Sequence, residues 1–128
     1  MKQLTKTLLV LFVFASLLSA QKIDESKVKH YEFFVKNLKK SLVSESPGIQ
    51  QSAIKLAGTH KVKKVAGLLE DLLDETKDEK TKIMIAQSLF EIGKESSMEK
   101  LAELAVTEKN DNVKKVYIAL HKQYSEKE

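Results

Sequence analysis

The chain has 128 residues, of which 42% are hydrophobic and 31% are charged, and its formal net charge is +4 at pH 7. It contains no cysteine, which excludes a disulfide framework and a lipid-modified cysteine. All 22 basic residues are lysine, so the planar guanidinium that reads guanine edges or clamps phosphate is missing, and a nucleic-acid partner is not expected.

Residues 1–20 have the layout of a secretory signal peptide. Two lysines precede an apolar run over residues 8–18, and the small pair Ser19 and Ala20 follows. The apolar run is shorter than the roughly 20 residues that a permanent membrane span needs. We therefore expect cleavage after Ala20 and a single mature domain over residues 21–128, periplasmic or secreted, with a net charge of +2 and no stable membrane span.

The mature chain shows helical spacing throughout, because its apolar residues recur at steps of three and four. The first predicted helix, over residues 27–43, is a cap whose buried face begins at Val28 and Tyr31. Two helical pairs are predicted over residues 47–74 and 78–107, and a terminal helix over residues 111–124. No segment alternates with a period of two, so no strand is expected.

Several helix ends carry recognisable signals. Thr76 and Glu79 have the spacing of a capping box, in which a hydroxyl and a carboxylate each satisfy an otherwise unpaired backbone N–H. Ser96 and Glu99 repeat that spacing ahead of the next apolar stripe. Other predicted starts are Ser46 with Pro47 and either Asn110 or Asp111, and the predicted stops are Gly58 and Gly93.

An internal repeat with a step of 32 residues relates the predicted helices. Ile49, Thr81 and Val113 occupy one expected core position at this step. A single helical pair cannot bury both of its apolar faces, so stacked repeats supply the core. We therefore predict an all-α fold, a short α-solenoid of stacked antiparallel helix pairs. The same step pairs Ala66 with Met98, Leu69 with Leu101, Leu72 with Leu104 and Leu73 with Ala105.

The stretch "LAGTHKVKK", residues 56–64, raises the question of a phosphate site because it carries a histidine and several lysines. The 32-residue step places it on "SLFEIGKES", residues 88–96, where the charges are mixed and no histidine occurs. The pattern of apolar residues and glycine recurs in the second segment, while the positive charge does not. We interpret the stretch as a joint within a repeat, with Gly58 ending one helix and Val62 and Val65 beginning the next apolar stripe.

The segments "TKIMIAQSLFEIGK" and "DNVKKVYIALHK" resemble HEAT repeats, and the short period is similar to the compact subclass named after phycobilisome lyases. Thr81, Lys82 and Gly93 occupy places typical of that family's first helix and joint. The resemblance covers residues 47 to about 124. It implies an α-α superhelix with a protein-binding role, and the named subclass implies tetrapyrrole handling as an alternative.

Candidate chemistry is sparse in this chain. The histidines His30, His60 and His121 lack a second histidine at helical ligand spacing, and the 32-residue step does not superpose them. The acidic run over residues 70–79 lacks the alternating oxygens and central glycine of a calcium loop. No nucleophile elbow, phosphate loop or dinucleotide fingerprint occurs. We expect no catalytic residue, no metal and no cofactor.

The leading hypothesis is an exported, non-catalytic scaffold or protein–protein interaction module with a protein or peptide partner. The alternative is a cofactor-handling or tetrapyrrole-handling lyase or chaperone-like protein. Helical geometry places one set of polar side chains off the core stripe of the second helices, where they would form the partner-binding face. The predicted face consists of Lys63, Glu70, Asp71, Asp74, Lys100 and Glu103.

Overall fold

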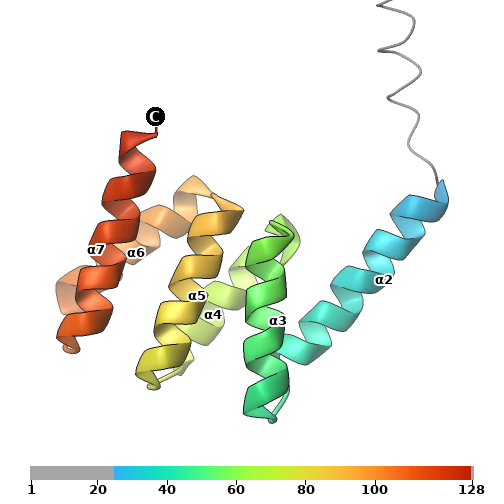
Figure 1. Cartoon of the computed structure of the whole chain (residues 1–128), viewed down its shortest axis with the longest axis horizontal. Helices are drawn as coiled ribbons and strands as arrows, with labels where there is room; N and C mark the ends of the chain where they lie inside the picture. Colours follow the sequence, from blue (N-terminus) through green and yellow to red (C-terminus); the bar gives the residue numbers. More distant parts are fainter. Residues whose placement is uncertain (1–24, 128) are drawn as a thin grey trace, which may run out of the picture. The chain divides into compact units, whose positions relative to one another are not determined.

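The computed structural model describes residues 25–127, so the predicted signal peptide lies outside the described residues. The chain divides into two compact units, residues 1–33 and residues 34–128. The described part contains six α-helices, one 3-10 turn and no strand, which confirms the predicted all-α class (Figure 1). The helices are α2 (Glu25–Leu42), α3 (Pro47–Thr59), α4 (Ala66–Glu75), α5 (Glu79–Ile92), α6 (Glu95–Thr107) and α7 (Asp111–Glu126), and the 3-10 turn η1 is Lys63–Val65.

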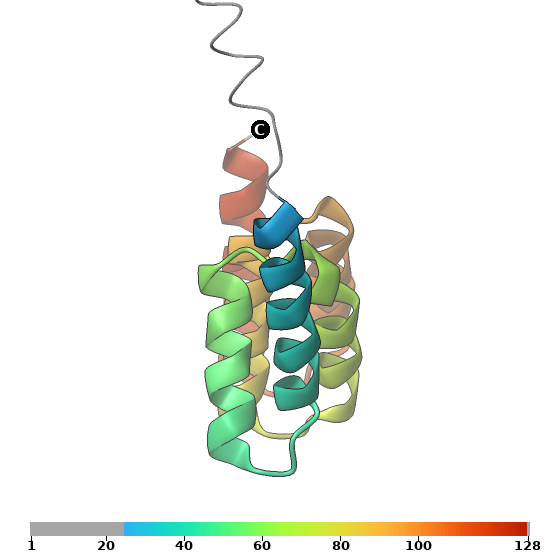
Figure 2. The same cartoon turned by 90° about the vertical axis from the view of Figure 1, so that its right-hand side faces the viewer.

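The second unit is a stack of antiparallel helix pairs in two layers. The first helices α3, α5 and α7 stand side by side in one layer, and the second helices α4 and α6 lie behind them (Figure 1). The two layers are seen from one end of the stack in Figure 2. α5 packs against α3, α4 and α7, and α6 packs against α7. Among the residues described, no helix combines the length and apolarity that crossing a bilayer requires.

The 32-residue step reappears in the starts of the first helices. Their N-cap residues, Ser46, Asp78 and Asn110, are spaced by 32. A side-chain oxygen two positions before each cap accepts a hydrogen bond from the backbone N–H of that cap. These acceptors are Ser44 at 3.2 Å, Thr76 at 3.3 Å and Glu108 at 3.1 Å. Each repeat therefore enters its first helix through the same hydrogen-bonded turn.

The N-terminal cap of α5 differs from the predicted capping box. The cap is Asp78, whose Oδ2 accepts hydrogen bonds from the Thr81 hydroxyl at 2.7 Å and the Thr81 backbone N–H at 2.9 Å. The prediction of Thr76 with Glu79 is wrong because Thr76 lies in the turn before the helix, two residues ahead of the cap, and the helix begins at Glu79. The hydrogen bonds from Thr81 lower the pKa of the Asp78 carboxyl below its ordinary value.

The start of α6 also differs from the prediction. The proposed box of Ser96 with Glu99 is wrong, since the helix begins at Glu95 after Lys94 and has no side-chain cap. The predicted stop at Gly93 is confirmed, and its left-handed φ of 75° ends α5 so near to α6 that only Gly93 and Lys94 lie between the two helices. A joint this short leaves no room for a capping side chain at residue 96.

Gly58 has a different role from the predicted helix stop. It is a buried residue inside α3, which runs to Thr59, and Lys61 takes the positive φ of 50° in the joint. A Cβ atom on Gly58 would lie 2.9 Å from both Cα and Oγ of Ser88 on α5 and 3.0 Å from Oε2 of Glu91. The glycine therefore permits close approach of two helices. As expected for the joint, His60 and Lys61 are exposed while Val62 is buried.

Polar bridges connect α5 to the start of α7. Lys82 Nζ donates a hydrogen bond to Glu108 Oε2 at 3.0 Å, and Glu79 accepts hydrogen bonds from the side-chain amides of Asn110 and Asn112, each at 3.0 Å. Burial would raise the pKa of the Glu108 carboxyl, but the hydrogen bonds from Lys82 and the Asn110 backbone outweigh it and lower that pKa. These bridges hold the beginning of α7 in register with α5.

The buried core follows the predicted stripes from Val35 onward, with exceptions at the N-terminal end of the chain. Val28 and Tyr31 of α2 are exposed, which corrects the predicted buried face of the first helix. Ile49 and Leu56 of α3 are also exposed. Every second-helix position that the 32-residue step paired in the sequence is buried or partly buried.

The replacement Gly58→Ala tests the close approach of α3 to α5. Alanine normally stabilises a helix interior, but here the added methyl group would collide with the Ser88 backbone. We expect a loss of about 1–3 kcal/mol in the free energy of unfolding, measured by urea titration. The matched control is Gly67→Ala on α4, where nothing lies within 4 Å and stability should be kept or slightly raised. Equal effects of the two replacements would contradict the role assigned to Gly58.

The replacement Asp78→Asn tests the charged cap of α5. The pKa of the Asp78 carboxyl is lower in the folded chain than in the unfolded chain, so its ionisation stabilises the fold above the ordinary pKa of about 4. This contribution is lost as pH falls through the lower, folded value. Asparagine caps helices well but does not titrate. The melting temperature of the wild type should therefore fall more between about pH 5 and 2.5 than that of Asp78→Asn. Parallel curves would exclude a titrating cap.

Candidate functional site

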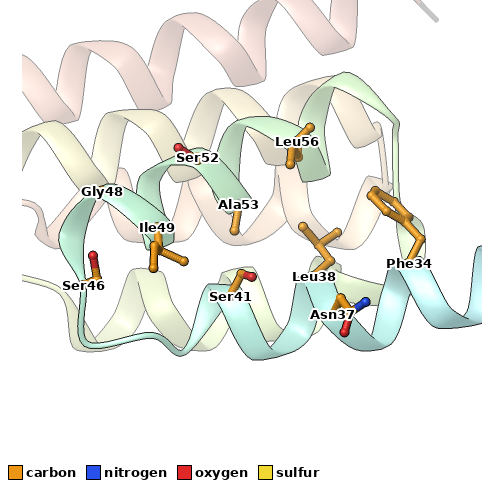
Figure 3. A pocket seen from close by; sticks show the side chains of 10 residues that line it. All are labelled: Phe34, Asn37, Leu38, Ser41, Ser46, Gly48, Ile49, Ser52, Ala53 and Leu56. Atoms are coloured by element: carbon orange, nitrogen blue, oxygen red, sulfur yellow. The ribbon is translucent and has the colours of Figure 1, made fainter.

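A groove runs between the C-terminal half of α2 and the whole of α3, within the second unit (Figure 3). It has a volume of about 510 Å³ and opens to solvent. Leu38 of α2 and Leu56 of α3 project toward each other across it (Figure 3). The complete lining is Phe34, Asn37, Leu38, Ser41, Ser46, Gly48, Ile49, Ser52, Ala53 and Leu56.

Helical spacing brings the apolar lining residues onto facing sides of the two helices. Phe34 and Leu38 are four residues apart on α2, and Ile49, Ala53 and Leu56 follow steps of four and three on α3. Leu38 and Ala53 are buried, whereas 52% of Ile49 and 43% of Leu56 remain exposed. The groove therefore has a closed apolar floor and an apolar rim in contact with water.

Two contacts hold the walls of the groove in place. Gln50 of α3 donates a side-chain hydrogen bond to the backbone oxygen of Leu42 at the end of α2, at 3.0 Å. At the other end, the Phe34 ring meets the His60 ring edge to face, with 5.6 Å between the ring centroids and 74° between the planes. Both ends of the α2–α3 pair are thus fixed, and the groove exists before anything binds to it.

The groove has the chemistry of a binding surface and lacks that of a catalytic site. None of its ten lining residues is acidic, basic or a histidine. Its polar groups are hydroxyls and one amide, which can form a few neutral hydrogen bonds. General acid–base catalysis needs a titrating group beside the reacting atoms, and this lining offers none. What the groove can do is cover an apolar surface of another molecule.

The predicted face on the second helices has another arrangement. Asp74 of α4 and Lys100 of α6 form an ion pair with 2.5 Å between Oδ2 and Nζ. Glu70 of α4 accepts a hydrogen bond of 2.6 Å from the hydroxyl of the buried Ser97. Three of the six predicted residues therefore take part in bridges between α4 and α6. The other three, Lys63, Asp71 and Glu103, are exposed, and the role of the six toward a partner stays a prediction.

The histidines lie in separate surroundings. His30 Nδ1 is 2.6 Å from the backbone oxygen of Ser26 in the same helix, and the His60 ring meets the Phe34 ring edge to face. His121 of α7 accepts a backbone hydrogen bond from the Ser125 hydroxyl at 3.0 Å. Over residues 25–127, no three histidine, aspartate or glutamate side chains converge in a way that could hold a metal ion.

The groove was missed at the sequence level, although a signal for it was present. Ile49 and Leu56 follow the core spacing of α3, and this spacing predicts that both side chains are buried. Their equivalents on α5 and α7 lie on helices that pack against a preceding first helix, whereas over residues 25–127 the first repeat has no such neighbour. The absence of a complete helical pair before residue 47 was the feature that marked this face as uncovered.

Comparison with known proteins gives one family. A family model described as HEAT repeats matches residues 35–121, which include α3 to α6, most of α7 and every groove-lining residue except Phe34. No curated protein and no solved structure was found to match the chain.

The replacements Ile49→Glu and Leu38→Ala separate the rim of the groove from its floor. Ile49 is half exposed in the first turn of α3, where the helix dipole favours an acidic side chain, so Ile49→Glu should change the free energy of unfolding by less than about 1 kcal/mol. Leu38 is buried, and Leu38→Ala should lower the free energy of unfolding by about 2–5 kcal/mol. Urea unfolding measures both. A severe loss for Ile49→Glu would mean that the rim belongs to the core.

Proposed function

The chain belongs to the HEAT-repeat family, and we propose that it is an exported scaffold that binds a protein or peptide partner in the groove between α2 and α3. HEAT repeats are generally protein-interaction modules and typically non-catalytic. One observation carries the proposal, which is the fixed apolar groove whose rim lies in water. The partner then supplies the biological role, because the groove itself carries no reacting group.

The free energy gained by covering the exposed apolar rim of the groove supports a bound partner. Ile49 and Leu56 expose about half of their side chains, and covering the remaining apolar area of each contributes on the order of 1 kcal/mol. Because the contacts of Gln50 and Phe34 already fix the walls of the groove, binding costs little conformational entropy there. An apolar pocket with a few neutral polar groups at its edge matches a peptide or a protein surface.

The alternative of tetrapyrrole handling has weaker support from the groove. Linear tetrapyrroles carry carboxylates, which bind best to cationic side chains. The lining of the groove contains no lysine. The assignment to the phycobilisome-lyase-like subclass therefore stays a prediction from the sequence resemblance.

Export is supported by the sequence of residues 1–20, with its basic start, apolar run and small residues at the end. The absence of cysteine agrees with a mature chain that needs no disulfide in an oxidising compartment. We therefore expect the partner to be a periplasmic or secreted protein or peptide. The second-helix face, through its exposed residues Asp71 and Glu103, is the competing surface for the same partner.

Photo-crosslinking in the native host tests the proposal. A photoreactive amino acid is placed at Ser52 in the groove, at Glu103 on the second-helix face, or at Lys122 on the far side of α7 as a control. We expect a specific protein adduct from Ser52 and none from Lys122. Mass spectrometry of the adduct should show a chain that begins near Gln21.

The possible results separate the parts of this proposal. An adduct from Glu103 alone would move the binding surface to the second helices. No adduct above the Lys122 background at either position would contradict a scaffold role. Full-length chain retained inside the cell would contradict export while leaving the binding result intact.

A further inference from the structure

The groove can be compared with two covered surfaces in the same chain, because α3, α5 and α7 are related by the 32-residue step. Ile49, Ala53 and Leu56 line the groove on α3. Their equivalents on α5 are Thr81, Ile85 and Ser88, all of which are buried, and α3 packs against α5. The equivalents on α7 are Val113, Tyr117 and Leu120, of which two are buried and the last is partly buried. This face is covered wherever a first helix precedes it.

The groove has room for the side chains of a further helix. Leu38 of α2 lines the groove and the backbone oxygen of Leu42 bonds to Gln50 of α3, but Ile49 and Leu56 stay exposed to water. The residue at the groove floor is small, since Ala53 occupies the position that Ile85 fills on α5 and Tyr117 fills on α7. The volume between α2 and α3 thus lies where a preceding repeat would place the side chains of its first helix.

We propose that the groove is an open repeat-stacking surface, and that its occupant is an amphipathic α-helix of a protein partner, stacked on α3 as α3 is stacked on α5. This inference rests on the proposed scaffold function and specifies the kind of partner. The contact between α3 and α5 is its template, because α3 stands at the N-terminal end of the row of first helices α3, α5 and α7 (Figure 1).

The template defines the chemistry of the partner helix. α3 meets α5 at the backbone oxygen of Ile54, which accepts a hydrogen bond from Ser88, and one turn later at Gly58, where the two backbones approach closely. Both Ile54 and Gly58 are buried. The partner helix therefore presents a branched apolar residue followed four positions later by a small one. Its contact face carries no charge, because a charge buried against Leu38 and Ala53 would have no partner in the groove lining. Ser52 and Ser41 at the edge accept polar neighbours.

A second copy of this chain fits the groove poorly. Head-to-tail growth would place the outer face of α7 on α3, and there Ile118 and Lys122 occupy the positions of Ile54 and Gly58. Lys122 is exposed on the free chain and would put an ammonium group against a groove that has no acidic lining residue. Lys115 adds a second positive charge on that face. The lysines therefore disfavour self-stacking, and the groove is left for another protein.

A helical peptide with the sequence of residues 47–60 serves as the probe. A hydrocarbon staple joins its positions 52 and 56, which point away from the stacking face and would otherwise leave a short helix marginal in water. The control peptide has the same staple and the replacement Gly58→Lys. Fluorescence anisotropy measures the binding of each labelled peptide to the full chain. We expect saturable binding of the first peptide and at least about tenfold weaker binding of the control.

A variant of the full chain locates the binding. Ile49→Glu combined with Leu56→Lys puts each charge at the helix end that the dipole favours, so the chain should stay folded, as checked by circular dichroism. This double variant should bind the first peptide at least about tenfold more weakly, while Lys122→Glu should bind it as the wild type does. Equal binding of both peptides, binding that survives the double variant, or no saturable binding would overturn the proposal.

Other occupants would give distinct and contrary results. Sedimentation that shows self-association of the full chain, abolished by the double variant, would assign the groove to a second copy. Backbone NMR signals of residues 1–24 that shift in the double variant without peptide would assign it to the chain's own N-terminal segment. If Ser52 crosslinks a protein in the host while the stapled peptide fails to bind, the scaffold function stands and the helical occupant is wrong.

Discussion

The Ser88 hydroxyl on α5 donates a hydrogen bond of 2.7 Å to the backbone oxygen of Ile54 on α3, beside the point where Gly58 leaves no room for a side chain. This contact sets how near two first helices stand to each other. With that spacing fixed, the second helices come within reach, so Ser97 of α6 bonds to Glu70 and Lys100 pairs with Asp74. The rest of the stack depends on a buried serine opposite a glycine.

The buried core and the polar bridges have different roles in the stack, since the core stabilises it and the bridges align its repeats. Stability comes mainly from burial of side chains such as Ile85, Leu101 and Tyr117, because ion pairs at or near the surface contribute little each. Burial raises the pKa of Tyr117 to about 12, with the carboxylates of Glu108 and Asp74 adding to the effect, so its phenol stays neutral in the core. The bridges that Lys82 forms with Glu108, and Lys100 with Asp74, select the alignment of one repeat on the next.

The sequence predicted the class of fold because apolar periodicity and the 32-residue step are properties of the chain alone. It failed where neighbours in space decide the outcome. Thr76 and Asp78 both offer an acceptor oxygen near the start of α5, and only the folded turn shows which one caps the helix. Gly58 resembles a helix stop in the sequence, because its close contact with Ser88 forms only when α3 and α5 pack together in the folded chain. The groove was missed for the same reason, because the exposure of Ile49 depends on whether another first helix covers it, and none of the described residues forms one.

The equal spacing of Ser46, Asp78 and Asn110 has a consequence for how such a chain can lengthen. An insertion or duplication of 32 residues moves every cap, joint and core position onto an equivalent one, wherever in the repeat the break falls. The register of the repeats is therefore preserved whenever the inserted segment has 32 residues. The ends of that segment need not coincide with the ends of helices. Insertions or deletions of one or two residues in the joints would instead disturb the register of the repeats, since Lys94 alone connects Gly93 to α6.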